Sequence, residues 1–149
     1  MRSKTPSTNT KLSGSGFHHV AIRVRDFDRS YAFYTEGLGF TYAHGWGEGD
    51  TRAALLDMGD GNYLELFASK PGQLPDRADV PAGDHYPYLH LALRSDDVAA
   101  DIEKVRALGC TITVEPKFAV VGDPPKTLNV GFFLGPDGET IEFFHNPDL

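Results

Sequence analysis

The chain has 149 residues, of which 40% are hydrophobic and 23% are charged, as is typical of one globular domain. Its 14 basic and 21 acidic residues give a formal net charge of −7, which repels nucleic acid and anionic membrane surfaces. A lone cysteine suits a reducing compartment, and no apolar run is long enough for a membrane span or a signal peptide, so we expect a cytoplasmic protein with a small-molecule partner.

Residues 1–16 are polar and are predicted to form a disordered tail. The alternation of residue types over 17–25 is typical of a β-strand. Asp26 or Asp28 is then a candidate cap for a helix with an apolar stripe of Phe27, Tyr31, Tyr34 and Leu38. Three further strands are expected at 40–44, 51–58 and 62–68. Residues 17–68 therefore read as one βαβββ module.

The second half of the chain repeats this order after a connector, 69–86, that is rich in Pro, Gly and Asp. A strand is expected at 87–94, followed by Ser95 or Asp96 as the cap of a second helix. The apolar face of this helix holds Val98, Ile102 and Val105. Strands are predicted near 110–114, 127–134 and 140–145, with a loop at 116–127. Residues 87–149 form the second predicted βαβββ module.

Two sequence patterns occur once in each module. FHHVAIRVRD at 17–26 matches YLHLALRSDD at 88–97, and DGNYLELF at 60–67 matches DGETIEFF at 137–144. In both copies the histidine precedes x-Ala-x-Arg, and the glutamate stands four residues after the glycine of an Asp-Gly turn. Such self-similarity indicates a duplication. His19 and His90 are then symmetry mates, and so are Glu65 and Glu142.

Strand alternation divides these residues between two faces of each sheet. If His19 lies on the open face, Ala21 and Arg23 lie there too, while the intervening aliphatic residues face the helix. The same parity puts His90, Glu65 and Glu142 on open faces and directs His18 away from His19. One face of each sheet thus carries ionisable side chains, while the other packs against the helix. This division predicts a polar cleft on the open face.

Two imidazoles and two carboxylates form a plausible ligand set for one divalent metal ion, such as Ni, Co, Zn, Mn or Fe. Each single His or Glu is a weak signal by itself. Four of them in register with a duplication make a stronger one. The alternative is a pair of structural His–Glu contacts without a metal.

With these residues in place, the chain resembles the vicinal oxygen chelate superfamily, which contains glyoxalase I, epimerases, extradiol dioxygenases and bleomycin-resistance proteins. The resemblance covers residues 17–146 and rests on four segments: HVAIRVRDFDRSYAFYTEGLGF, YLELF, HLALRSDDVAADIEKVRALG and GPDGETIEFF. It implies one α+β domain in which two tandem βαβββ modules form an open, incomplete β-barrel around a metal.

The ligand set His19, Glu65, His90 and Glu142 resembles that of glyoxalase I most. The resemblance implies a metal-dependent lyase or isomerase that acts on the hemithioacetal of a 2-oxoaldehyde and a thiol, through an enediolate. It assigns proton transfer chiefly to Glu142, with Glu65 as a ligand and second base, and substrate binding to Arg23. It also implies a homodimer.

One residue departs from the glyoxalase I pattern, because Ser69 stands where that enzyme commonly has an asparagine that serves glutathione. The departure leaves other functions open. The alternatives are another metalloenzyme of the superfamily, either an epimerase or a dioxygenase, and a non-catalytic binding or resistance protein.

Overall fold

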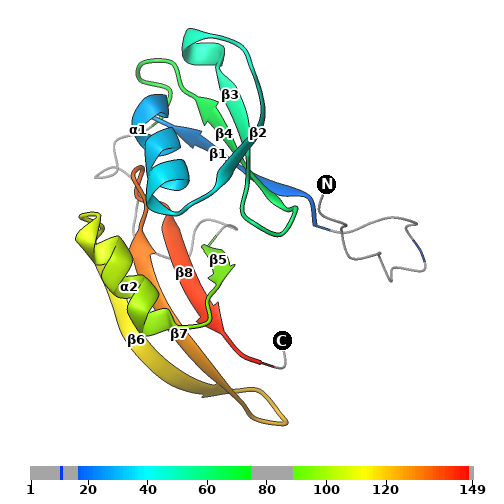
Figure 1. The fold of residues 1–149 in the computed structure, drawn as a ribbon, viewed down its shortest axis with the longest axis vertical. Coiled ribbons are helices and arrows are strands. Elements are labelled where there is room, and N and C mark those ends of the chain that lie inside the picture. Colours follow the sequence, from blue (N-terminus) through cyan, green and yellow to red (C-terminus); the bar gives the residue numbers. More distant parts are fainter. Residues whose placement is uncertain (1–10, 12–16, 75–88, 148–149) are drawn as a thin grey trace. The chain divides into compact units, whose positions relative to one another are not determined.

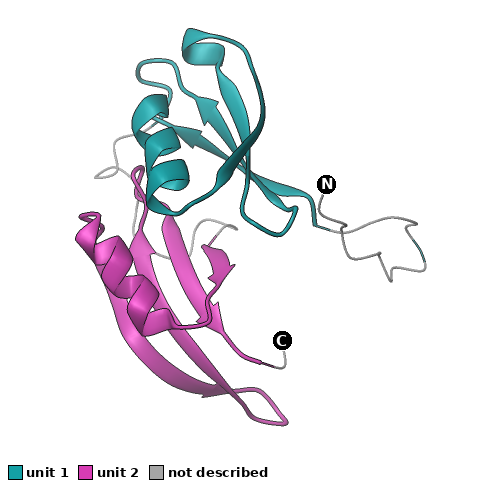
Figure 2. Cartoon of the chain, viewed as in Figure 1, with its two compact units in different colours: residues 1–75 teal, residues 76–149 magenta. Residues whose placement is uncertain are grey.

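The computed structural model of the chain describes residues 11, 17–74 and 89–147. The chain divides into two compact units, 1–75 and 76–149 (Figure 2). The predicted tail, apart from residue 11, and the connector from residue 75 onward lie outside the described residues.

The first unit is a four-stranded sheet with one helix beside it (Figure 1). Its main elements are β1 (His19–Val24), α1 (Phe27–Ala32), β2 (Thr41–Trp46), β3 (Ala53–Asp57) and β4 (Tyr63–Ala68). A π-helical turn, η1 (Phe33–Gly37), continues α1, and a 3-10 turn, η2 (Gly49–Thr51), precedes β3. Asp26 caps α1 by accepting a hydrogen bond from the backbone N–H of Arg29, which confirms one of the two predicted caps.

The second unit has the same plan. Its elements are β5 (Leu91–Arg94), α2 (Val98–Ala107), β6 (Ile112–Val121), β7 (Lys126–Leu134) and β8 (Thr140–His145). The strand orders β1-β4-β3-β2 and β5-β8-β7-β6 match, and in each sheet the first and last strands of the unit pair in parallel. The prediction of an α+β fold built from βαβββ units is confirmed, and among the described strands neither sheet closes on itself.

Two predictions for the second unit were wrong. The cap of α2 is Asp97, whose carboxylate accepts from the backbone N–H of Ala100, whereas the Ser95 hydroxyl donates to the Asp101 carboxylate. The segment expected as a loop at 116–127 is mostly strand, because β6 runs to Val121 and pairs with β7. The β-branched residues of 118–121 favour this extended conformation, and the proline at 116 is tolerated because β6 is an edge strand.

The core of each unit lies between its helix and one face of its sheet. On β4 the even positions Leu64, Leu66 and Ala68 are buried, while the residues between them are partly exposed. On α2 the predicted apolar face is fully confirmed, since its members Val98, Ile102 and Val105 are all buried. The helix approaches β7 closely at Gly131, where a Cβ atom would stand 2.8 Å from Cγ1 of Ile102.

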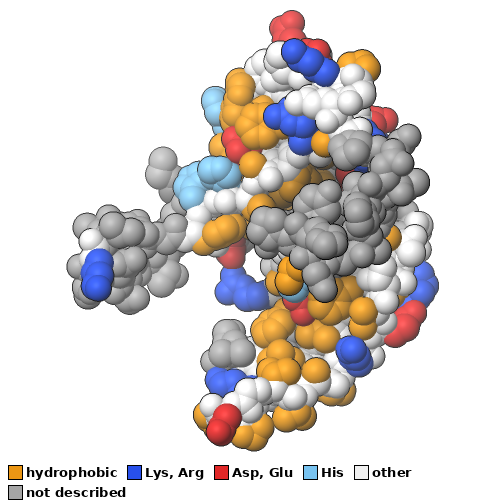
Figure 3. Space-filling view, turned by 180° about the vertical axis from the view of Figure 1, so that it is seen from behind, with side chains coloured by type: hydrophobic (Ala, Val, Ile, Leu, Met, Phe, Trp, Pro, Cys, Tyr) orange, Lys and Arg blue, Asp and Glu red, His pale blue; other side chains and the backbone are white. Residues whose placement is uncertain are grey.

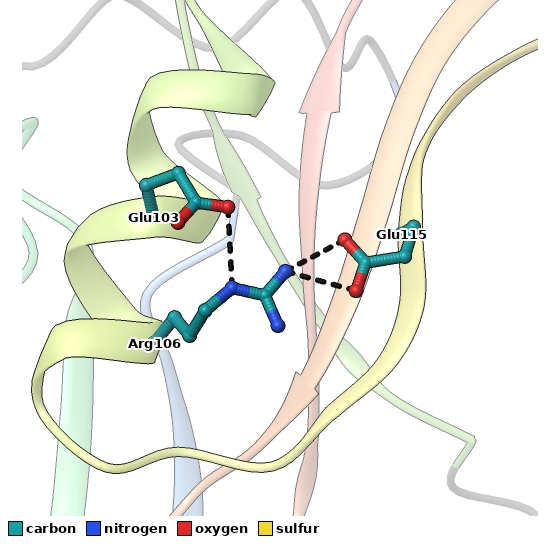
Figure 4. A network of polar contacts seen from close by, with 3 residues as sticks. All are labelled: Glu103, Arg106 and Glu115. Atoms are coloured by element: carbon teal, nitrogen blue, oxygen red, sulfur yellow. Dashed lines mark hydrogen bonds and ion pairs between the residues drawn. The ribbon is translucent and has the colours of Figure 1, made fainter.

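A charged clamp joins α2 to the edge strand β6 (Figure 4). One terminal nitrogen of Arg106 donates to both carboxylate oxygens of Glu115, at 2.8 and 2.7 Å, while Nε donates to Glu103 one turn earlier. These contacts raise the pKa of Arg106, chiefly through the hydrogen bond to Glu115. The clamp therefore links the helix to the strand at the end of the described sheet.

Replacing Arg106 with Met is expected to lower the melting temperature slightly, because exposed ion pairs stabilise weakly. The loss should shrink as salt screens the charges. The comparison is Lys104→Met, which removes a pair with Asp101 that lies within α2 alone. Thermal melts at low and high salt would measure both, and an equal loss in the two variants would contradict a role in joining helix to strand.

No helix in the part of the chain that the structure describes is long and apolar enough to cross a membrane.

Candidate functional site

The first pair of site residues lies on the open face of the first sheet. Ala21 of β1 stands beside Glu65 of β4, and His19 precedes Ala21 by two residues on the same face. His19 is therefore the diagonal cross-strand neighbour of Glu65, and Nε2 of His19 lies 3.3 Å from Oε2 of Glu65. The predicted parity is confirmed here, because His19, Ala21 and Arg23 are exposed while Val20, Ile22 and Val24 are less so.

The second unit repeats this diagonal. Ala92 of β5 stands beside Glu142 of β8, and His90 comes two residues before Ala92. Nε2 of His90 lies 2.9 Å from Oε2 of Glu142. The ring of His90 also packs edge-on against Phe132, with ring centroids 5.4 Å apart, and Phe132 is the β7 neighbour of Glu142.

Glu142 is the buried carboxylate of this arrangement. The residue is 8% exposed, and its chain neighbours Ile141 and Phe143 are buried on the opposite face of the sheet. Burial raises the pKa of Glu142 above its ordinary value, and the charge of His90 and its hydrogen bond offset part of that shift. Figure 3 shows hydrophobic side chains gathered over the second unit, with histidine and acidic atoms among them. The negative charge of a buried carboxylate is stabilised when a positive charge lies beside it.

The structure brings the four predicted residues together as two His–Glu pairs, one in each unit. Among the residues it describes, no group of three or more His, Cys, Asp and Glu side chains gathers as a metal site. Each unit thus contributes one imidazole nitrogen and one carboxylate to its own open face.

The chemistry of each pair fits a divalent metal ion. Imidazole nitrogen and carboxylate oxygen are ligands of Zn, Fe, Ni, Co and Mn. In each pair the Nε2 atom already points at the carboxylate, so both donors converge on one point of the open face. An ion held there would also neutralise the desolvated charge of Glu142.

A row of side chains crosses the open face of the first sheet beside Glu65. The strand register aligns Trp46, Ala53, Phe67 and Arg23 across β2, β3, β4 and β1. The indole of Trp46 contacts Phe67 edge-on, with centroids 6.1 Å apart, and the guanidinium carbon of Arg23 lies 5.6 Å from the Phe67 ring centroid. Together these side chains form an aromatic surface with one cationic end.

Arg23, which is expected to bind substrate, and Ser69, which stands in place of the asparagine, both donate hydrogen bonds to backbone carbonyls. Arg23 donates from one terminal nitrogen to the carbonyl oxygen of Ala68, at 2.7 Å, which fixes the direction of its side chain. The hydroxyl of Ser69 donates to the carbonyl oxygen of Val24, at 2.8 Å. Because its one proton is used there, Ser69 is left as a hydrogen-bond acceptor and does not replace an amide donor.

His18 is the residue whose place the sequence argument got wrong. Its ring does not point away from His19. Nδ1 of His18 lies 2.9 Å from Nδ1 of His19, and its ring stacks at a tilt on Tyr63. Strand alternation does not constrain His18, because β1 begins at His19. The signal that was available is the His-His doublet itself.

A sequence profile of the Glyoxalase/Bleomycin resistance protein/Dioxygenase superfamily matches residues 16–143. The chain belongs to this superfamily. It is 30% identical to a lactoylglutathione lyase of Haemophilus influenzae, over 86% of this chain and 90% of the relative. It is also 30% identical to the 2-epi-5-epi-valiolone epimerase of an Actinomyces species, over 87% of this chain and 79% of the relative.

Solved structures show the same fold. The antibiotic-binding protein TnmS3 of Streptomyces sp. CB03234 superposes with a TM-score of 0.64 at 24% identity, over 89% of this chain and 96% of its own. The two sequence relatives thus carry the names of a lyase and an epimerase, while TnmS3 shares the fold. The predicted resemblance to the superfamily is confirmed.

Proposed function

We propose that this protein is a metal-dependent lyase or isomerase of the glyoxalase I type, which acts on the hemithioacetal of a 2-oxoaldehyde and a thiol. The observation that carries the proposal is the repeated diagonal pair, with Nε2 of each histidine 3.3 or 2.9 Å from a glutamate oxygen. Purely structural pairs need no such repetition at matching positions. The lactoylglutathione lyase among the relatives supports the same reaction class.

His19, Glu65, His90 and Glu142 would hold one divalent ion. When bound, the ion would stabilise the negative charge that develops on two adjacent oxygens of the substrate. The two neutral imidazoles add no charge to the ligand set. The two carboxylates carry one negative charge each, which together balance the charge of a divalent ion.

Glu142 is the group we assign to proton transfer. A desolvated carboxylate is a stronger base than a hydrated one, and Glu142 is both 8% exposed and raised in pKa by burial. It would take the proton from one substrate carbon and return it to the neighbouring carbon, as a base and then as an acid. Glu65 would serve as a ligand and as a second base.

Arg23 would bind an anionic group of the thiol portion of the substrate. Its guanidinium is aimed by the hydrogen bond to Ala68 and lies over Phe67, so it presents charge next to an apolar ring. Because Ser69 offers an acceptor in place of an amide donor, the thiol need not be glutathione. Glutathione should be compared with smaller thiols of equal charge.

The decisive test begins with chelator-stripped protein reloaded with Ni, Co, Zn, Mn or Fe. We expect stoichiometric binding and metal-dependent isomerisation of a methylglyoxal hemithioacetal. His90→Gln should reduce both by at least about tenfold, because it removes a direct ligand. His145→Gln is the matched control, since it replaces a histidine of the same unit whose Nδ1 lies 2.8 Å from the backbone carbonyl oxygen of Ser95. Absence of stoichiometric metal would remove the lyase, epimerase and dioxygenase together.

We also propose a homodimer, with the two pairs joined either within one chain or between two chains. Mixing a chain that lacks His19 and Glu65 with one that lacks His90 and Glu142 separates these cases. Restored activity would require ligands from two chains, whereas none would be restored if one chain supplies all four.

A second candidate function is the binding of an aromatic small molecule without catalysis. The surface of Trp46, Phe67 and Arg23 favours it, because Trp46 remains 43% exposed there. Trp46 is the single tryptophan of the chain, so ligand binding would change the intrinsic fluorescence directly. Quenching by planar ligands in chelator-treated protein, without turnover, would favour this function over the first.

A further inference from the structure

His18 and His19 form a contact between two neighbouring imidazoles. Their Nδ1 atoms lie 2.9 Å apart, and the two rings meet edge-on, with centroids 5.1 Å apart and planes at 85°. The other nitrogen of His19, Nε2, faces Glu65 at 3.3 Å. The His19 ring is therefore held at both of its nitrogens.

His18 is itself fixed from two sides. Its carbonyl oxygen accepts a hydrogen bond from the backbone N–H of Tyr63, at 2.8 Å. Its ring rests on the Tyr63 ring, with centroids 5.1 Å apart. Tyr63 is the direct β4 neighbour of His19, so the contact that supports His18 belongs to the same open face as Glu65. Tyr63 thus places the His18 ring where it can reach His19.

An imidazole can meet two different needs of His19. When Nε2 of His19 donates to the Glu65 carboxylate, a neutral His19 has a lone pair on Nδ1, and His18 must donate to it. When Nε2 gives its lone pair to a cation, Nδ1 carries the proton, and His18 must accept it. A carbonyl or carboxylate could only accept. His18 can do either by moving its own proton between its two nitrogens.

We propose that His18 is a positioning residue that fixes the ring orientation of His19 and is the Nδ1 hydrogen-bond partner of either His19 tautomer. The proposal rests on the proposed function, in which Nε2 of His19 is a metal ligand. It makes the two modules unequal, because the position before His90 holds Leu89, which carries no ring nitrogen. His90 is positioned by the edge contact with Phe132 instead.

The test compares His18→Leu, which removes the partner, with His18→Asn, whose amide can both donate and accept. The metal probe is Co²⁺, titrated into chelator-stripped protein. His18→Leu is expected to weaken Co²⁺ binding about 10–100-fold, the usual effect of removing a hydrogen-bond partner from a ligating histidine. His18→Asn should restore most of the affinity. An unchanged dissociation constant in the Leu variant would overturn the proposal.

A readout without metal separates this proposal from the proposed function. Nitrogen chemical shifts of the histidine rings, recorded about two pH units above the ordinary histidine pKa, report which nitrogen carries the proton. In metal-free wild-type protein we expect the proton on Nδ1 of His18 and on Nε2 of His19. In His18→Leu the Glu65 carboxylate still accepts from Nε2 of His19, so the proton should stay there, but the Nδ1 resonance of His19 should shift because its lone pair loses its hydrogen bond. If wild-type protein binds no Co²⁺, the proposed function fails, and the tautomers alone decide: mixed tautomers in the wild type overturn the role of His18.

Discussion

Replacing Glu142 with Gln is expected to reduce turnover by about 10²–10⁴-fold, the range contributed by a positioned general acid–base group. Glutamine has nearly the same shape and can still accept a hydrogen bond from Nε2 of His90, but it takes no proton. Steady-state rates with the hemithioacetal, measured at equal metal content, would give this ratio. Turnover near the wild-type value in a folded variant would rule out Glu142 as the base.

The same variant makes a second, independent prediction about stability. The folded pKa of Glu142 is raised by burial, so the folded protein holds the proton to higher pH than the unfolded chain does. Stability of the metal-free protein must then fall as pH rises from the ordinary glutamate pKa through the folded pKa. Glu142→Gln lacks this loss, so above that pH window its melting temperature should equal or exceed that of the wild type.

Glu65→Gln is the comparison that separates base from ligand. Glu65 occupies the matching position of the first unit, at a similar distance from its own histidine. Because Glu65 is proposed as a ligand and second base, Glu65→Gln should lower turnover less than Glu142→Gln does. Equal losses in both variants would mean that the two carboxylates act alike, and the assignment of a single principal base would be wrong.

The sequence predicted that His19, Glu65, His90 and Glu142 lie on open faces because a strand that packs against a helix has a strict period of two. His19 and Arg23 are exposed while Val24 is buried, as alternation requires. The two Asp-Gly turns could also be predicted, because glycine readily adopts positive φ. Gly61 and Gly138 both have φ of 82°. Strand alternation and turn glycines were therefore enough to predict the repeat and the face on which each proposed ligand lies.

Features that depend on exact register could not be read in this way. A β-bulge between Tyr42 and His44 shifts β2 by one residue. Without it, alternation from Thr41 would put Trp46 on the helix side; with it, Trp46 stands in line with Phe67 on the open face. The prediction of the α2 cap was wrong because Ser95, Asp96 and Asp97 are all residue types that cap helices, and the structure shows that Asp97 accepts from Ala100.

Replacing Phe133 with Ala is expected to lower the free energy of unfolding by about 3–5 kcal/mol, the usual cost of deleting a buried aromatic ring. Phe133 on β7 is fully buried, and its ring packs on Phe143 of β8 with centroids 5.0 Å apart. The small neighbour Gly131 leaves α2 close to the sheet, so the helix has little room to move in and fill the cavity. Urea denaturation would measure the change, and a loss below about 1 kcal/mol would contradict this account of the core.

Phe118→Ala is the matched control, because it removes the same ring from the neighbouring strand β6. Phe118 is 75% exposed, so its loss from an isolated chain should change stability by no more than about 0.5 kcal/mol. The control also bears on assembly. Phe118 and Val120 form an exposed apolar pair on an edge strand, a surface that a partner chain can cover. If Phe118→Ala destabilises the protein by several kcal/mol and the effect depends on protein concentration, this edge is covered by a second chain in solution.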